Sequence, residues 1–156
     1  MVCKTRGRMI YKIAIASDHA GFYYKEKIKI YLKKLGHKFK DFGTMANTPV
    51  DYPDYAHIIA KNISSRKFKI GILICGTGIG MSIVANKHKR VRAAVCESIE
   101  SARYSRLHNN ANILCVGARI TSLVTVKKII HEFLKSDFEY GRHTKRIKKI
   151  HSLTGL

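Results

Sequence analysis

The stretch that decides the fold is Ile70–Cys75, IGILIC, followed directly by the loop Gly76–Gly80, GTGIG. A continuous run of apolar and small residues is typical of a strand buried on both faces, as in a parallel sheet. The three glycines at alternate positions of the loop permit a sharp turn into a helix that is predicted over Met81–Lys87. The segment therefore predicts a central parallel strand with a glycine loop at its carboxyl end.

The same alternation of apolar runs and helical segments extends outward from this strand in both directions. Strands are predicted over Tyr11–Ala16, Lys38–Phe42, Val91–Cys96 and Ile113–Val116, and helices over Gly21–Leu35, Tyr55–Ile63, Ile99–Leu107, Ser122–Leu134 and Arg142–Ile150. Helices of this length between strands imply right-handed crossovers and a doubly wound parallel sheet. We expect one α/β domain over residues 10–156 that ends in a basic helix, preceded by a flexible basic extension over residues 1–9.

Composition restricts the class of protein. The chain has 156 residues, 46% of them hydrophobic, which is too many for a disordered protein. The longest charge-free run, Ile70–Asn86, has 17 residues and four glycines, and is too short to span a membrane. The 30 Lys and Arg residues against 10 Asp and Glu residues give a net charge of +20. This charge points to nucleic acid or to another anionic partner.

The cysteines indicate a reducing compartment. Cys3, Cys75, Cys96 and Cys115 form no Cys-x-x-Cys pair, so neither a structural zinc site nor a disulfide framework is expected. The apolar stretch behind the basic residues 1–8 is broken at Lys12, which makes it a poor secretory signal. The sequence therefore predicts a cytoplasmic protein with free thiols and no metal.

Ligands of open α/β sheets bind beyond the carboxyl ends of the strands. Those ends carry Asp18 and His19, Cys75 with its glycine loop, and Arg119, which we expect to converge at one edge of the sheet. The loop N–H groups and the helix start behind them favour an anion, and they favour the thiolate of Cys75. The alternatives are a buried, inert Cys75 and a loop that is only a tight turn.

The loop matches two nucleotide-binding motifs only in part. A dinucleotide fingerprint needs a third glycine where this chain has Met81, and the lysine of a Walker loop is absent. A nucleotide-binding sensor is therefore the weaker hypothesis.

A second group of polar residues falls at the opposite edge of the predicted sheet. His108 and Asn109 follow a helix and precede a strand, so they either end that helix or reach the site of a neighbouring subunit in a symmetric dimer. Arg142 and Arg146 share one helix face and could hold a phosphate. The alternative is a solvated basic face that also includes His143, and the remaining lysines are expected on such solvated faces.

Several of these motifs together resemble one family, ribose-5-phosphate isomerase type B. The resemblance spans roughly Tyr11 to Arg146 and rests on Ser17-Asp18-His19-Ala20-Gly21, Asp51-Tyr52-Pro53, Gly71–Ser82, Ala85-Asn86-Lys87, Arg92-Ala93-Ala94, His108-Asn109, Asn112 and Gly141-Arg142-His143. The resemblance implies a Rossmann-like fold, and dimers or tetramers with active sites shared between subunits. It also implies a cytoplasmic enzyme of the pentose phosphate pathway that interconverts ribose 5-phosphate and ribulose 5-phosphate without a metal or cofactor.

The resemblance also assigns roles to single residues. Cys75 would be the base, since no Glu stands on the following helix to replace it, and His108 assisted by Asp18 would open the sugar ring. The enediolate would be stabilised by Thr77 and the N–H groups of the loop Gly76, Thr77, Gly78, Ile79 and Gly80. The phosphate would be held by His19, Arg119, Arg142 and Arg146, and the sugar hydroxyls by Tyr52 and Asn109. The family's usual second glycine before Arg142 is replaced here, in Tyr140-Gly141.

Two other functions remain open on the sequence. The same family includes isomerases of six-carbon sugar phosphates of the allose and galactose type, which share the chemistry. A basic nucleic-acid-binding module would use the net charge, but the lysines are spread over many segments and no recognition motif is present. We therefore expect no specific nucleic acid and no membrane partner.

Overall fold

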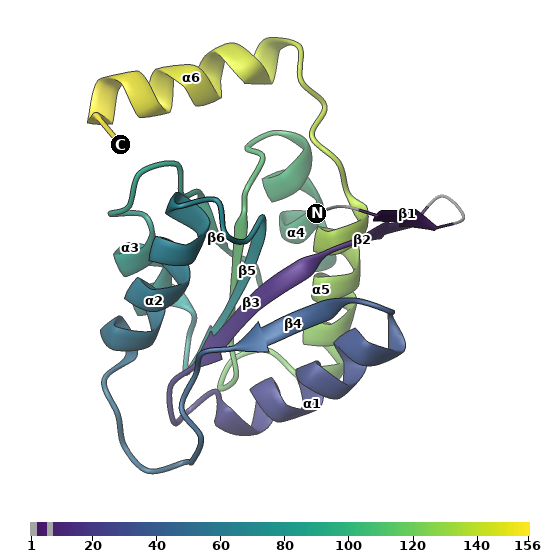
Figure 1. The fold of residues 1–156 in the computed structure, drawn as a ribbon, viewed down its shortest axis with the longest axis vertical. Helices are drawn as coiled ribbons and strands as arrows, with labels where there is room; N and C mark the ends of the chain where they lie inside the picture. The colour runs from purple at the N-terminus through teal and green to yellow at the C-terminus, as the bar shows by residue number, and fades with distance from the viewer. Residues whose placement is uncertain (1–2, 6–7) are drawn as a thin grey trace.

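The computed structural model describes residues 3–5 and 8–156. Its main sheet has five parallel strands in the order β4-β3-β5-β7-β6 (Figure 1). These strands are β3 (Lys12–Ser17), β4 (Lys38–Asp41), β5 (Ile70–Cys75), β6 (Ala93–Val95) and β7 (Ile113–Gly117). The predicted doubly wound five-stranded parallel sheet is confirmed.

Helices cover both faces of the sheet, as Figure 1 shows. They are α1 (Phe22–Lys34), α2 (Tyr52–Ser64), α3 (Ile79–Ala85), α4 (Ile99–Leu107), α5 (Leu123–Lys135) and α6 (Arg142–Thr154). One core joins the sheet to α1, α4 and α5, and the other joins it to α2 and α3. The central position of β5 follows from its composition, because its side chains enter both cores and every residue is buried.

The structure corrects two predicted helix starts. Helix α2 begins at Tyr52, not Tyr55, since Pro53 occupies the first turn, where its missing N–H leaves no hydrogen bond unmade. Helix α3 begins at Ile79 rather than Met81, so the last two residues of the glycine loop form its first turn. Both errors arose because proline and glycine were interpreted as loop residues.

The N-terminal residues form an element that the sequence did not suggest. Strands β1 (Cys3–Thr5) and β2 (Arg8–Ile10) pair antiparallel as a separate two-stranded sheet. Residues 1–2 and 6–7 of the predicted flexible extension lie outside the described residues. The flexibility of the extension stays a prediction.

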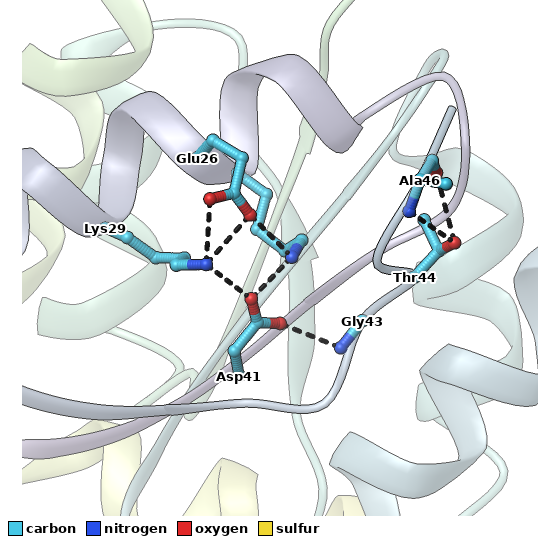
Figure 2. A network of polar contacts seen from close by, with 7 residues as sticks. Glu26, Lys29, Asp41, Gly43, Thr44 and Ala46 are labelled. Atoms are coloured by element: carbon cyan, nitrogen blue, oxygen red, sulfur yellow. Dashed lines mark hydrogen bonds and ion pairs between the residues drawn. The ribbon is translucent and has the colours of Figure 1, made fainter.

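One lysine contradicts the prediction of solvated lysine faces. Lys25 is fully buried, and its Nζ lies 2.5 Å from Asp41 Oδ2 and 2.9 Å from Glu26 Oε1. Lys29 Nζ bridges the same two acids, and Asp41 Oδ1 accepts the N–H of Gly43 at 2.9 Å (Figure 2). The buried ammonium group is tolerated because two carboxylates compensate its charge.

Helix α6 lies beyond the amino-terminal ends of the strands, at the far end of the molecule from the loop after β5 (Figure 1). Its contacts with the body include Arg92 Nη1, 3.0 Å from His151 Nε2. Ile150 and Leu153 are exposed by 46% and 74%. In the part of the chain that the structure describes, no helix has the length and apolar character of a membrane span.

Candidate active site

The carboxyl ends of β3, β5 and β7 border a cavity of about 200 Å³, here called the thiol pocket. It is lined by Asp18, His19, Ala20, Tyr52, Cys75, Gly76, Thr77, Gly80 and Arg119. The predicted convergence of an acid, a histidine, a thiol and an arginine at this edge is therefore confirmed.

Cys75 ends β5 and is 5% exposed within the thiol pocket. The N–H of Gly78 donates to Cys75 Sγ at 3.1 Å, and this donor stabilises negative charge on the sulfur when its proton leaves. Gly78 has φ of +80°, and a Cβ there would lie 3.1 Å from the Val116 carbonyl carbon. The turn that presents this N–H to the sulfur therefore depends on glycine.

The residues of the glycine loop differ in whether they line the pocket and in whether their N–H groups already have an acceptor. The N–H of Ile79 donates to Thr77 Oγ1 at 3.3 Å, so two loop N–H groups are engaged within the loop itself. Gly78 and Ile79 do not line the pocket, whereas Gly76, Thr77 and Gly80 do. An anion in the pocket therefore meets part of the predicted N–H cradle rather than all of it.

The other two described thiols differ from Cys75. Cys96 and Cys115 are buried in the two cores. Burial raises the pKa of Cys96, and it raises the pKa of Cys115 well above its ordinary value. Both thiols stay protonated, which leaves Cys75 as the described cysteine that borders a polar cavity.

Two backbone contacts hold the acid and the histidine in place. Asp18 Oδ1 accepts the N–H of Gly21 at 3.0 Å at the start of α1. His19 Nδ1 lies 3.2 Å from both the N and the O of Val50, in the connection between β4 and α2. Because Nδ1 is engaged, Nε2 is the ring nitrogen of His19 that a bound anion can use.

Arg119 and Tyr52 complete the wall of the thiol pocket. The N–H of Arg119 donates to the Gly76 carbonyl at 2.9 Å, and its side chain packs against Gly76. The ring of Tyr52 packs so closely on Gly80 that a Cβ there would lie 2.6 Å from Cζ. Tyr52 reaches the pocket because Pro53 allows α2 to start here, a signal that the sequence interpretation missed.

The remaining predicted site residues do not line the thiol pocket. His108, Asn109, Arg142 and Arg146, here called the distal group, lie at or beyond the amino-terminal side of the sheet in the same chain. Asn109 borders a different cavity, of about 360 Å³, together with residues of α6. The predicted separation of His108 from the carboxyl edge is confirmed, and it extends to both arginines.

His108 belongs to a cluster that the sequence did not reveal. Its ring stacks on His143 with centroids 4.4 Å apart and planes 9° apart. Glu139 Oε2 lies 3.7 Å from His108 Nε2 and 3.6 Å from His143 Nε2. His143, for which a solvated helix face was one alternative, is buried, and burial, with His108 and the guanidinium group of Arg142 nearby, lowers its pKa.

This cluster is the one set of potential metal ligands among the described residues, with ligand atoms within 4.8 Å of one another. Lone pairs of imidazole nitrogens lie in the ring plane, so nearly parallel rings direct them side by side rather than toward one ion. We assign no metal to the cluster.

Fold and pocket together define a class. A thiol, an acid, a histidine and an arginine meet around a small polar cavity at the carboxyl edge of a parallel sheet, as in α/β enzymes that bind small anionic substrates.

The family follows from comparison with known proteins. The model of the family described as Ribose/Galactose Isomerase matches residues 13–150, and the chain belongs to this family. Ribose-5-phosphate isomerase B of Escherichia coli strain K12 is 42% identical over 139 residues, which cover 89% of this chain and 93% of that protein.

Solved structures agree with this placement. Ribose-5-phosphate isomerase B of Clostridium thermocellum is 46% identical, with a TM-score of 0.91 and coverage of 92% of this chain and 97% of its own. The enzyme of Mycoplasma genitalium with bound ribulose-5-phosphate is 40% identical, with a TM-score of 0.89 and coverage of 92% and 96%.

Proposed function

We propose that the chain is an aldose-ketose isomerase that interconverts D-ribose 5-phosphate and D-ribulose 5-phosphate through an enediolate. The observation that carries the proposal is the position of Cys75, whose thiol borders the same pocket as Arg119 and His19. A base thus lies beside two groups suited to a phosphate dianion. The related enzymes named above carry this activity in their names, and one of them binds ribulose-5-phosphate.

The reaction moves one carbon-bound proton. The thiolate of Cys75 takes the proton from C2 of the open-chain aldose, and the electron pair forms the enediolate double bond. The same sulfur then returns the proton to C1, while the proton of the C2 hydroxyl passes to the C1 oxygen, which gives the ketose. The Gly78 N–H stabilises the negative charge of the Cys75 thiolate between turnovers.

Charge on the enediolate oxygen requires donors that are fixed in advance. Thr77 and the loop N–H groups other than those of Gly78 and Ile79 are the candidates. Removing one donor costs about 3–4 kcal/mol in comparable oxyanion sites. Asp18 and Tyr52 border the same pocket and are placed to bind sugar hydroxyls.

The distal group completes the site when it comes from a second copy of the chain. His108 would open the sugar ring, Asn109 would contact a hydroxyl, and Arg142 and Arg146 would join His19 and Arg119 on the phosphate. Both arginines are exposed on α6, which extends away from its own thiol pocket (Figure 1). A twofold dimer supplies each pocket with the other chain's distal group, since such an interface is reciprocal.

The cellular setting follows from the same proposal. The substrate pair places the enzyme in the non-oxidative branch of the pentose phosphate pathway. All three cysteines whose side chains are described are free, which supports a reducing cytoplasm.

The decisive experiment measures conversion of ribose 5-phosphate to ribulose 5-phosphate by the purified chain. Cys75→Ala should abolish turnover while the fold and sugar-phosphate binding persist, because only the base is lost. Cys96→Ala is the matched control and should retain turnover, since Cys96 lies in a core away from the pocket. Full turnover by Cys75→Ala would refute the assignment of Cys75 as the base. Faster turnover of allose 6-phosphate or galactose 6-phosphate than of ribose 5-phosphate would identify a six-carbon sugar phosphate as the substrate.

The shared site is tested by complementation. Cys75→Ala and His108→Ala chains should each be inactive, and mixing them should restore up to about half of the sites in a mixed dimer. One pocket then receives an intact Cys75 and an intact His108. An absence of recovery after subunit exchange, verified by mass spectrometry, would count against a site built from two chains.

A further inference from the structure

Another cavity lies at the amino-terminal side of the sheet, at the opposite end from the thiol pocket. Its volume is about 800 Å³, and we call it the basic cavity. Its walls are the connections that lead into the strands, the connection between α5 and α6, and single residues of α2, α4 and α6. The lining residues are Tyr11, Ile63, Arg66, Phe68, Lys69, Ile70, Arg90, Arg92, Arg106, Asn110, Asn112, Asp137, Phe138, Tyr140 and His151.

The cavity carries a large excess of positive charge. Five cationic side chains line it, Arg66, Lys69, Arg90, Arg92 and Arg106, against the single carboxylate of Asp137. Across residues 10–156, whose side chains the structure describes, none of the five forms an ion pair. Such an uncompensated group of cations beside a cavity favours an anionic ligand.

Three of the arginines are held by backbone carbonyls. Arg90 Nη2 donates to the Ser64 carbonyl at 2.8 Å and Arg92 Nε to the Asn110 carbonyl at 2.9 Å. Arg106 Nη1 donates to the Ala111 carbonyl at 2.6 Å. These contacts fix the guanidinium groups without neutralising them, so the positive charge is arranged before any ligand arrives.

Burial makes the positive charge of two of these guanidinium groups unfavourable. Arg106 is 7% exposed, and burial lowers its pKa. Burial and the positive charge of Arg106 together lower the pKa of Arg92. The charge of Arg106 therefore disfavours that of Arg92 in a partly dehydrated wall, whereas Tyr11 and Asp137 act to raise the pKa of Arg106. A bound anion would relieve the remaining penalty of burial on both groups.

A buried hydroxyl beside Arg106 gives a second indication. Tyr11 is 4% exposed and lines the cavity, and its hydroxyl makes no hydrogen bond of normal geometry, although the charge of the nearby Arg106 acts on it. A buried polar group without a partner costs about 1–3 kcal/mol. An anion in the cavity would supply the missing acceptor.

We propose that the basic cavity is a second ligand site, separate from the isomerase pocket, that binds a phosphate compound with several negative charges. Inorganic polyphosphate and a nucleoside polyphosphate share this chemistry. The nucleotide would also use the rim, where the rings of Phe138 and the exposed Tyr140 lie 4.8 Å apart. The site stands independently of the proposed isomerase activity, and it gives a role to part of the positive charge that the sugar-phosphate site does not use.

The test measures binding of ATP and of sodium triphosphate to the full chain by calorimetry at fixed ionic strength. Lys69→Glu places a negative charge in the cavity wall and should weaken both ligands about tenfold or more. Lys67→Glu is the matched control, since this exposed lysine is two positions away, changes the net charge equally and does not line the cavity. It should change the affinity less than about twofold.

Tyr11→Phe provides a second variant that keeps the packing. It should weaken binding by several fold while leaving the free protein about as stable, because the hydroxyl it removes makes no hydrogen bond of normal geometry. Tighter binding of ATP than of triphosphate identifies a nucleotide, whereas equal affinities identify a polyphosphate site.

Three outcomes overturn the proposal. They are equal losses in Lys69→Glu and Lys67→Glu, competitive displacement of the anion by ribose 5-phosphate, and no heat of binding at about millimolar ligand. Because binding is measured without turnover, an inactive enzyme would refute the proposed isomerase and leave this site intact.

Discussion

Asp41 shows how one carboxylate can hold a buried lysine in place. Burial acts to raise the pKa of Asp41, but hydrogen bonds from Lys25 and Lys29 outweigh it, and the pKa lies below its usual value. A carboxyl whose folded-state pKa is lowered stabilises the fold above its unfolded pKa, and this contribution is lost as the pH falls through the folded value. The Lys25 network in Figure 2 is therefore an acid-sensitive part of the fold.

The variant Asp41→Asn tests whether the charge of Asp41 stabilises the fold. The variant should be markedly less stable than the parent at pH 7, and the difference should shrink below about pH 4, where the parent also loses the charge of Asp41. Urea denaturation across this pH range measures it. Glu97→Gln, at an exposed position, should show no such convergence. A constant difference at all pH values would mean that Asp41 acts by packing alone.

Single residues of the site were predictable where topology alone places them. Asp18, Cys75 and Arg119 follow strands of one parallel sheet, so their convergence needed no knowledge of side-chain packing. Lys25 and His143 were not predictable, because their surroundings come from other parts of the chain, Asp41 for Lys25 and the ring of His108 for His143. Lys25 has the same spacing as the solvated lysines around it, so the sequence does not show that it is buried.

At the scale of elements, the turn from β5 into α3 depends on a left-handed residue. Gly78 and Gly36 have nearly the same φ, +80° and +79°, but a Cβ at Gly36 meets nothing within 4 Å. Gly36→Ala should therefore cost about 1 kcal/mol from backbone strain alone. Gly78→Ala should cost clearly more and also reduce isomerase turnover, since the N–H on Cys75 shifts.

Thermal unfolding and the isomerase assay are applied to both alanine variants. The difference between their losses of stability separates backbone strain, which both share, from contact of the new methyl group with Val116, which only Gly78→Ala has. Equal losses of stability would mean that the backbone of Val116 yields to the new methyl group. Retained turnover in Gly78→Ala would mean that the Gly78 N–H is not needed by the thiol.

The order and type of the elements were predicted well, and their ends less well. The buried run of β5 and the amphipathic α5 are long patterns with one interpretation each. Helix starts at Tyr52 and Ile79 were misplaced because proline and glycine fit both a loop and a first helical turn. The hairpin of β1 and β2 carries too few residues for any periodic signal.

For the whole molecule, α6 is the element that the proposed two-chain site places against a second copy of the chain. Ile150 and Leu153 stand three residues apart on one exposed face of this basic helix. Under the two-chain site, Leu153→Glu should convert dimers to monomers and lower turnover steeply, because the distal group leaves the other chain's pocket.

Sedimentation velocity gives the mass of each variant, and Ile30→Glu on α1 is a control of comparable exposure that should remain dimeric. A dimer that persists in Leu153→Glu would place the contact elsewhere. The sequence could assign His108 to the far edge, but a helical pattern alone does not show how far α6 extends from the body.

The carboxyl ends of the strands, where the thiol pocket lies, and helix α6 are at opposite ends of one chain (Figure 1), and in the proposed dimer this separation determines how mutant alleles combine. Under the two-chain site, an allele that loses only Cys75 leaves one working pocket in each mixed dimer. An allele that loses both Cys75 and His108 leaves none, because the defective chain fails in its own pocket and in that of its normal partner. With equal amounts of both chains and random pairing, the double mutant would leave about a quarter of all pockets working, whereas each single mutant would leave about half, as expected from gene dosage alone.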